Sequence, residues 1–363
     1  MQKFIASGVT PMPGKLQMDK ISALTGYSVS TVSRVLAGKA YTSERARELI
    51  LRCARQLGVL DALAGGRLLL GNVAVFAPGR TFNPRGDLFY REVTRGIAEA
   101  LAAHNVCLSY CGLEEQHADI EAFLDKAGNK QINAVIIIGT DDAAIFRLAA
   151  ALNKPCVLIN TTDRDMALDA ISPDHYAIGF NAVRHVFGRG HRRILSLSCL
   201  RRNTLYTRLH GIQEAYRHFH VPFDAQQDLI VTEGFSAEEA EQALEAWLAS
   251  HPVSCWPEVI FPGCMGMASG VLRVLARRRL RVPEDMSLIT TDFRWHLENG
   301  PGMAVTGIAV PCRELGSEAV HLLQYRLNRP QAPVCHLLLQ GRVIEGETVN
   351  YATRHAARVA LGQ

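Results

Sequence analysis

The 363-residue sequence predicts an all-helical N-terminal domain followed by an α/β body of two doubly wound lobes. Three observations lead to this prediction. At about 150 residues per domain, the length allows two or three domains. Positive charge is concentrated in the first 71 residues. From Asn72 onward, short apolar runs alternate with segments of helical periodicity in two successive series, which is typical of parallel sheets with crossover helices.

The charge divides the chain into a basic head and a nearly neutral body. The first 71 residues contain ten Lys or Arg and four Asp or Glu side chains, a net charge of +6. Because the whole chain has a net charge of +4, the remaining residues sum to −2. Such a head indicates a module that binds a polyanion. A solvated basic surface would carry the same charge, so charge alone leaves both interpretations open.

The basic segment has the pattern of three helices, at Gln17–Thr25, at Val29–Ala37 and after Ser43. Ser28 and Ser43 are suited to accept hydrogen bonds from the first-turn amides of the second and third helices. The second helix turns apolar residues inward and leaves small polar residues and Arg34 outward. Two short helices joined by a glycine-containing turn form a helix-turn-helix, whose second helix enters the major groove of DNA. The alternative, an ordinary three-helix bundle, would not need such an outward face.

The body is expected to contain two series of strands separated by helices. The expected strands are Val73–Ala77, Val106–Tyr110, Ala134–Ile138 and Cys156–Asn160, then Ile194–Ser198, Leu229–Thr232, Val259–Phe261 and Ser287–Thr291. The expected helices are Tyr90–His104, Ala118–Lys130 and Ala143–Leu152, then Ile178–Arg189, Thr207–His220, Ala237–Ser250 and Met267–Arg278. In doubly wound lobes, ligands bind where the carboxyl ends of the strands face a cleft.

Several classes of protein are disfavoured. No apolar run approaches the roughly 20 residues of a membrane span, and the first residues lack the apolar core of a secretory signal. Nine cysteines, an odd number without a CxxC pair, fit neither a zinc site nor a disulfide framework. The segment Gly8–Leu16 resembles a phosphate loop but has one residue too many and ends in leucine. We expect a cytoplasmic protein without metal, cofactor, membrane contact or enzymatic activity.

Two parts of the sequence point to one family. Residues Ile21–Leu36, and above all the string S-x-x-TVSRVL at Ser28–Leu36, resemble the headpiece of the lactose-repressor (LacI) family of bacterial transcription regulators. In the body, Gly190–Ile194, Arg208–Gly211 and Val282–Ser287 resemble the periplasmic-binding-protein-like type I sensor of that family. The resemblance covers roughly residues 17–345.

The resemblance implies a division of the chain and a function. The implied segments are an N-terminal extension at 1–16, a DNA-binding headpiece at 17–59, a hinge or linker at 60–71, a two-lobed effector-binding and dimerisation domain at 72–345 and a C-terminal tail at 346–363. The implied protein is a regulator that binds a near-palindromic double-stranded DNA operator as a dimer or tetramer. It is expected to repress transcription. A small effector such as a sugar or nucleoside would alter the angle between the lobes and thereby the DNA affinity.

The residues expected to contact DNA lie mainly on the second helix. Base edges are assigned to Val29, Ser30 and Arg34, and phosphates or mixed contacts to Ser22, Thr31 and Ser33, with Ser28 at the helix start. Leu68 aligns with the residue that wedges into the minor groove in relatives. However, Gly65 and Gly66 would each cost about 1 kcal/mol of helix stability, so a flexible linker is the alternative to a hinge helix.

The resemblance also places an effector site in the cleft. Arg208, whose guanidinium can chelate paired oxygens, and Asp292 hold the effector in the family, although an ordinary salt bridge between them is the alternative. The remaining expected residues are Phe89 and Tyr90, which stack on the effector or pack in the core, Asn160, which can hydrogen-bond, and Cys264, which replaces an asparagine common in relatives.

Two other classes of protein share part of this sequence pattern. An enzyme of the sugar or nucleoside hydrolase class would share the scaffold, but its calcium-dependent type needs an Asp-rich end of the first strand, which Val73–Pro78 lacks. A periplasmic sugar carrier is opposed by the headpiece and by the missing signal sequence. The sequence therefore favours a regulator without indicating which effector it binds, or whether that effector induces or co-represses.

Overall fold

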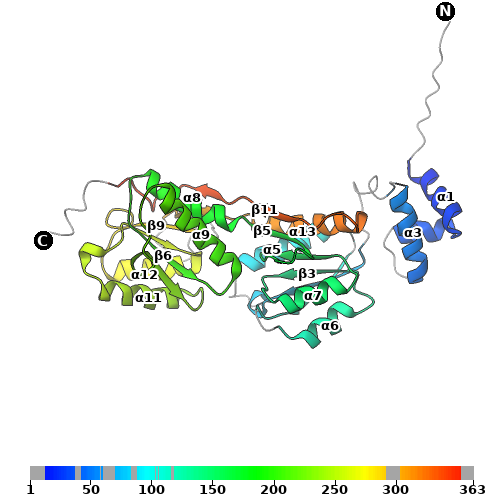
Figure 1. Cartoon of the computed structure of the whole chain (residues 1–363), viewed down its shortest axis with the longest axis horizontal. Helices are drawn as coiled ribbons and strands as arrows, with labels where there is room; N and C mark the ends of the chain where they lie inside the picture. Colours follow the sequence, from blue (N-terminus) through cyan, green and yellow to red (C-terminus); the bar gives the residue numbers. More distant parts are fainter. Residues whose placement is uncertain are drawn as a thin grey trace, which may run out of the picture.

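The computed structural model describes residues 13–36, 42–57, 59, 70–82, 88–102, 104, 106–115, 118–291 and 303–352. Three N-terminal helices lie at one end of an elongated molecule, and two α/β lobes follow side by side along its long axis (Figure 1). This arrangement confirms the predicted fold class. Within the described ranges, none of the helices combines the length and the apolar character that a membrane span requires.

The N-terminal domain consists of α1 (Pro13–Thr25), α2 (Val29–Leu36) and α3 (Glu44–Gln56). Ile21, Val32 and Ile50, one from each helix, are fully buried where the helices meet. Ser43 caps α3, as predicted, by accepting a hydrogen bond from the amide of Ala46 at 3.3 Å. Helix α1 begins four residues before the expected start, because a proline is tolerated in the first turn of a helix.

The first lobe, called the N-lobe, is built on a six-stranded parallel sheet in the order β11-β5-β4-β3-β1-β2. Its strands are β1 (Asn72–Ala77), β2 (Cys107–Gly112), β3 (Ala134–Ile138), β4 (Cys156–Ile159), β5 (Asp169–Pro173) and β11 (His336–Leu339). Alternate β1 residues face opposite sides: Val73 and Val75 pack against α5 (Leu88–Ala102) and α13 (Cys312–Asn328), and Phe76 packs against α6 (Ile120–Gly128) and α7 (Ala143–Ala151). A short 3-10 helix, η1 (Gly79–Phe82), follows β1.

The second lobe, called the C-lobe, has a sheet in the order β12-β10-β9-β8-β6-β7, in which only the β10–β12 pair is antiparallel. Its strands are β6 (Ile194–Cys199), β7 (Leu229–Thr232), β8 (Val259–Pro262), β9 (Ser287–Thr291), β10 (Thr306–Ala309) and β12 (Arg342–Ile344). One face packs against α8 (His175–Gly188) and α9 (Asn203–His218), and the other against α11 (Ala237–Ser250) and α12 (Met265–Arg277). The short α10 (Ala225–Asp228) and η2 (Val253–Cys255) lie in connections.

The described chain passes between the lobes at three places: from β5 to α8, from β10 to α13, and from β11 to β12. The elements β5, β10, β11, β12 and α13, which flank these crossings, were not predicted from the sequence pattern. The C-lobe also continues beyond the expected boundary at residue 345. The hydroxyl of the buried Thr348 donates to the carbonyl of Leu288 at 2.6 Å, and Asn350 accepts from the Ser287 hydroxyl at 2.9 Å.

In each lobe, one pair of helices meets through glycines. A Cβ on Gly96 of α5 would overlap the carbonyl oxygen of Arg313, and one on Gly316 of α13 would overlap that of Val93. Gly179 of α8 and Gly211 of α9 show the same arrangement in the C-lobe. The backbones of α5 and α13, and those of α8 and α9, are therefore in direct contact.

Candidate functional site

The outward face of α2 carries the residues predicted to contact DNA. Val32, Val35 and Leu36 are buried against the other headpiece helices, as expected from the periodicity. The outward side chains are mostly exposed and comprise Ser28, Val29, Ser30, Ser33 and Arg34, with Thr31 half-buried beside them. The face is small and polar with one cation, which suits entry into the major groove.

Local hydrogen bonds order this face. The Ser28 hydroxyl accepts from the amide of Thr31 at 3.3 Å and lies 2.9 Å from the Thr31 hydroxyl, so it caps α2 as predicted. Arg34 donates from Nε to the Ser30 carbonyl at 3.3 Å. Ser22 is half-buried, and its hydroxyl donates to the Tyr27 carbonyl at 2.6 Å, which holds the turn between α1 and α2. Leu68 and the two linker glycines lie outside the described residues.

Arg208 lies on the second turn of α9 and is linked to the N-lobe through His175, which contacts Asn160. Its side chain is buried although it is charged, with an exposed fraction of 5%. Nη1 donates to the carbonyl of Gly263 and to the hydroxyl of Thr291, both at 2.7 Å, and Nη2 donates to Nδ1 of His175 at 3.2 Å. Since Gly263 follows β8 and Thr291 ends β9, Arg208 sits at the carboxyl ends of the C-lobe strands.

Asn160 and Tyr90 of the N-lobe are connected to Arg208 through His175. Asn160 follows β4 with a left-handed backbone conformation (φ 54°), and its side chain is buried. Its Oδ1 lies 2.8 Å from His175 Nε2, and its Nδ2 donates to the Tyr90 hydroxyl at 3.2 Å. Three of the predicted effector residues, Arg208, Asn160 and Tyr90, are thus joined through one histidine that the sequence reasoning missed.

Arg202, at the start of α9, donates several hydrogen bonds to residues of the N-lobe. It is 2% exposed and donates to both carboxylate oxygens of Asp141, from Nε at 3.1 Å and from Nη2 at 3.2 Å. Its Nη1 donates to the Tyr90 hydroxyl at 2.5 Å, and its Nη2 donates to the Asn160 carbonyl at 2.8 Å. All of these partners belong to the N-lobe, so one C-lobe side chain ties the lobes together.

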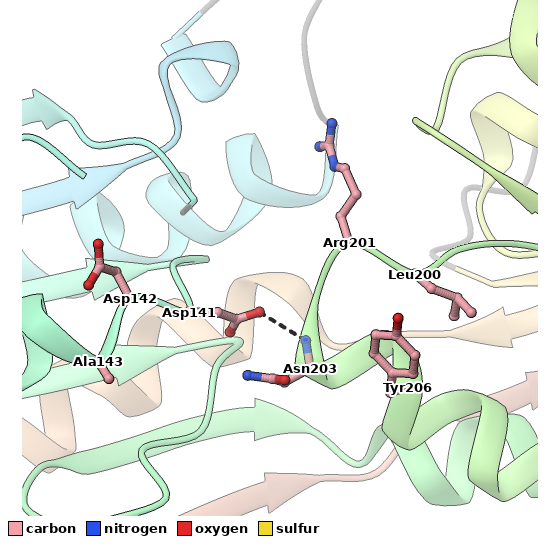
Figure 2. A pocket seen from close by; sticks show the side chains of 7 residues that line it. All are labelled: Asp141, Asp142, Ala143, Leu200, Arg201, Asn203 and Tyr206. Carbon is pink, nitrogen blue, oxygen red and sulfur yellow. Dashed lines mark hydrogen bonds between the residues drawn. The ribbon is translucent and has the colours of Figure 1, made fainter. Parts of the chain in front are cut away.

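A second ion-pair cluster lies beside this contact. Glu115, which follows β2, accepts from Arg80 of the N-lobe at 2.6 Å and from Arg201 of the C-lobe at 2.8 Å. The amide of Asn203 donates to Asp141 Oδ2 at 2.9 Å (Figure 2). The interlobe contact therefore contains two carboxylates of the N-lobe facing two arginines of the C-lobe.

The pKa values of these groups follow from burial and pairing. Burial alone would raise the pKa of Asp141 and of Glu115, but the neighbouring arginines and their hydrogen bonds hold both values below the ordinary range. Burial would lower the pKa of Arg202, but Tyr90 and Asp141 raise it. For His175, burial together with the charges of Arg208 and Arg202 lowers the pKa well below 6.5. At neutral pH the cleft holds charged arginines, charged carboxylates and a neutral imidazole.

The other predicted effector residues are Phe89, Cys264 and Asp292. Phe89 is half-buried on the N-lobe core, with its ring edge-on to that of Tyr90 at 5.1 Å between centroids. Cys264 occupies the N-cap position of α12, next to Gly263, but its thiol makes no capping hydrogen bond and donates weakly to the Phe235 carbonyl at 3.7 Å. Asp292, which directly follows Thr291, lies outside the described residues.

An open cavity of about 490 Å³ lies between the beginnings of α7 and α9. Figure 2 shows its lining, which is Asp141, Asp142, Ala143, Leu200, Arg201, Asn203 and Tyr206. It is therefore an interlobe cavity that shares Asp141 with the Arg202 contact. Among the described residues, no group of His, Cys, Asp and Glu side chains is arranged to hold a metal ion.

The cleft residues that the sequence analysis did not predict share a position relative to the strands. Asp141 and Arg202 lie a few residues beyond the carboxyl ends of β3 and β6, and His175 begins the helix after β5. A search for charged or titratable residues directly after each predicted strand would have found Asp141 and Arg202. His175 follows a strand that was itself not predicted.

Comparisons with known proteins agree with this architecture. The family model described as a periplasmic binding protein-like domain matches residues 183–349. The HTH-type transcriptional repressor CytR of Escherichia coli K12 is 27% identical over 314 residues, covering 84% of this chain and 88% of the relative. The ribose operon repressor of the same strain is 24% identical over 322 residues, covering 86% and 93%.

Solved structures show the same fold. A complex of the transcriptional regulator CelR with cellobiose is 20% identical, has a TM-score of 0.67 and covers 91% of this chain and 99% of that one. The lac repressor dimer bound to operator and the anti-inducer ONPF is 20% identical, with a TM-score of 0.65 and coverage of 91% and 98%. A LacI family regulator from Enterococcus faecium with bound ribose has a TM-score of 0.65 at 22% identity, covering 78% and 100%.

Proposed function

We propose that the chain is a regulator of the LacI family, a homodimeric repressor whose affinity for a near-palindromic operator is controlled by a small effector. It is a regulator rather than an enzyme. Two copies of α2 would read two half-sites about one helical turn apart, which is why a dimer is proposed. A tetramer built from such dimers is also compatible with this proposal. The proposed compartment is the cytoplasm.

The headpiece supports the DNA-binding part of the proposal. The small polar face of α2 with Arg34 is exposed, ordered by local hydrogen bonds and carried by a basic segment. We assign base contacts to Val29, Ser30 and Arg34. We assign phosphate contacts to the surrounding hydroxyls of Ser22, Ser28, Thr31 and Ser33. The proposed domain division remains the headpiece at 17–59, the linker at 60–71 and the two-lobed body from residue 72.

The observation that carries the effector site is the meeting of Arg208, Asn160 and Tyr90 between the lobes. A molecule held there would contact both lobes, so its binding would favour one interlobe angle over another. Guanidinium, amide and phenol groups suit a ligand with several hydroxyl or carbonyl oxygens. Ribose and cellobiose, bound in similar regulators, support a polyhydroxylated effector such as a sugar or nucleoside. Phe89, Cys264 and Asp292 are proposed to complete the site.

Two measurements test the proposed function. Because the basic headpiece displaces counterions from phosphates, operator affinity should fall steeply as the salt concentration rises, and a flat response would contradict DNA binding. A thermal-shift screen against sugars, nucleosides and their phosphates should then identify a ligand that also alters operator binding in a gel-shift assay.

Arg208 gives the site-specific test. Arg208→Met should abolish both the thermal shift and the effect of the ligand on operator affinity. Arg273→Met, which changes a half-exposed arginine of the same lobe that is paired with Glu238, is the matched control and should retain both. If Arg208→Met still responds to the ligand, Arg208 holds only Gly263 and Thr291 in place.

A further inference from the structure

His175 lies where the chain passes from the N-lobe sheet into the C-lobe. It begins α8, directly after Asp174, which caps that helix. Its imidazole is 6% exposed and contacts one polar side chain from each lobe. Nδ1 is 3.2 Å from Arg208 Nη2 of the C-lobe, and Nε2 is 2.8 Å from Asn160 Oδ1 of the N-lobe. His175 therefore bridges two residues that are proposed to hold the effector.

The direction of each hydrogen bond follows from donor chemistry. A guanidinium group can only donate, so Nδ1 of His175 accepts from Arg208 and the ring hydrogen is on Nε2. Nε2 then donates to Asn160 Oδ1, and Nδ2 of Asn160 donates to the Tyr90 hydroxyl at 3.2 Å. Donation therefore runs in a single direction from Arg208 across the cleft to Tyr90.

Only a neutral imidazole fits between these partners. A proton on Nδ1 would face the guanidinium of Arg208, and the charge of Arg202 is also close enough to oppose protonation. Asp174, the adjacent carboxylate, accepts from the amide of Ala177 in the first turn of α8. Burial and two neighbouring cations thus favour the neutral ring.

We propose that His175 is a positioning residue of the effector site. As a neutral imidazole with its hydrogen on Nε2, it holds Arg208 of one lobe and Asn160 of the other in the arrangement that receives the effector. This inference rests on the proposed function, because it concerns the same site. Removing the imidazole releases both partners together, so effector affinity depends on a side chain that acts through its neighbours.

The first test needs no ligand. The full-length protein with nitrogen-15 in its histidine rings is studied by NMR, and the His175 signals are assigned by their loss in His175→Gln. We expect one neutral tautomer, with hydrogen on Nε2, that persists well below pH 6.5, where an ordinary histidine would become charged. Protonation with that ordinary midpoint, or a hydrogen on Nδ1, would overturn the proposal.

The second test measures effector affinity, with ribose, cellobiose and nucleosides as the probes. His175→Leu, which removes both ring nitrogens at similar size, should weaken binding on the order of 10-fold or more, because two hydrogen-bond partners are released. His175→Gln keeps a donor and an acceptor and should restore most of the affinity. Circular dichroism establishes that each variant is folded.

His191→Gln is the matched control. His191 is also buried in the C-lobe, but it contacts the Asn350 carbonyl at 2.9 Å, away from the cleft, so its replacement should leave the affinity unchanged. Equal losses in folded His175→Gln and His175→Leu would assign His175 a packing role and contradict the proposal. If no probe binds the wild type, the proposed effector class is wrong, and the NMR result then decides the proposal on His175.

Discussion

The outward face of α2 and the cleft between the lobes place polar side chains in opposite environments. On α2, Ser30 and Arg34 are exposed, and their hydrogen bonds are made within about one turn of the same helix. In the cleft, Arg202, His175 and Asn160 are buried and bond to residues far away in the sequence. The side chains on α2 are therefore positioned by neighbours in their own helix or at its start, whereas those in the cleft depend on partners in the other lobe.

This difference predicts how substitutions combine. Changes on α2 should affect DNA binding with little effect on folding, and the energies of changes at positions that are not hydrogen-bonded to each other should be nearly additive. Changes in the cleft should affect stability, interlobe geometry and effector binding together, because one substitution removes partners from several neighbours.

The largest effect is expected from Asp141→Ala, which removes the two carboxylate hydrogen bonds of the buried Arg202 and leaves it the more distant Glu115, 3.9 Å from Nη1, as an ion-pair partner. Removing one partner of a buried ion pair typically costs about 3–5 kcal/mol, measured here as the free energy of unfolding in urea. Asp285→Ala is the control, because it breaks the surface pair with Arg281 and should cost at most about 1 kcal/mol. Equal small losses in the two variants would mean that Arg202 regains water when Asp141 is removed.

A smaller effect is expected on α2. Arg34→Ala should weaken operator binding by about 1–3 kcal/mol and should affect random DNA much less, because a base contact carries sequence specificity. Unfolding in urea should be nearly unchanged, in contrast to Asp141→Ala. Gel shifts with operator and random DNA measure the difference, and an equal loss on both would assign Arg34 to a phosphate.

The linker between the two regions provides a third comparison. Replacing both Gly65 and Gly66 with alanine should strengthen operator binding by up to about 2 kcal/mol if the segment becomes a helix on DNA, because each glycine costs about 1 kcal/mol in a helix. Operator affinity in gel shifts measures this change. Unchanged or weaker binding would mean that the segment remains a flexible linker, and Leu68→Ala would then leave DNA bending unaffected.

The cleft also predicts a pH dependence that α2 does not share. The pKa of His175 is lowered in the folded state, so the unfolded chain binds more protons below about pH 6.5. The free energy of unfolding should therefore fall as the pH decreases through about 6.5, by up to about 1.4 kcal/mol per pH unit for one proton. Burial and the charge of Arg189 also lower the pKa of His185. This histidine therefore makes a separate contribution to the pH dependence of the free energy of unfolding. Asp141 and Glu115 act in the same direction, but only below about pH 4.5.

Urea unfolding of the wild type and His175→Gln at several pH values measures the part that His175 contributes. The variant should show a smaller slope below about pH 6.5, because it lacks one group that becomes protonated on unfolding. Identical slopes would assign the whole dependence to other residues.

The same contrast explains what the sequence could predict. The face of α2 follows from helical periodicity within eight residues, and β3, β7 and β9 have their expected bounds because each is a short apolar or β-branched run. Strand β5 was missed because it begins with a buried aspartate and ends with a proline. Asp169 is compatible with that buried position because Arg326 of α13 donates to both of its oxygens at 2.7 Å and the amide of Cys335 donates to Oδ1 at 3.0 Å. No local pattern indicates a partner that is 157 residues away.

The residues of the cleft were predicted only in part, because their contacts also join distant parts of the sequence. Arg208, Tyr90 and Asn160 were found through the resemblance to a family. Arg202 contacts Tyr90, 112 residues earlier, and His175 contacts Arg208, 33 residues later, so the spacing within the sequence does not reveal either contact.

The glycine contacts within each lobe affect which mutations a genetic screen of this regulator would recover. Gly96, Gly316, Gly179 and Gly211 lie where any side chain would overlap a neighbouring backbone, so even alanine forces two helices apart. Random mutagenesis scored by reporter expression would therefore mark these four positions as strongly as residues on α2. The resulting alleles would be recessive losses of folded protein, and measuring the amount of repressor in the cell would separate them from alleles that have lost DNA recognition.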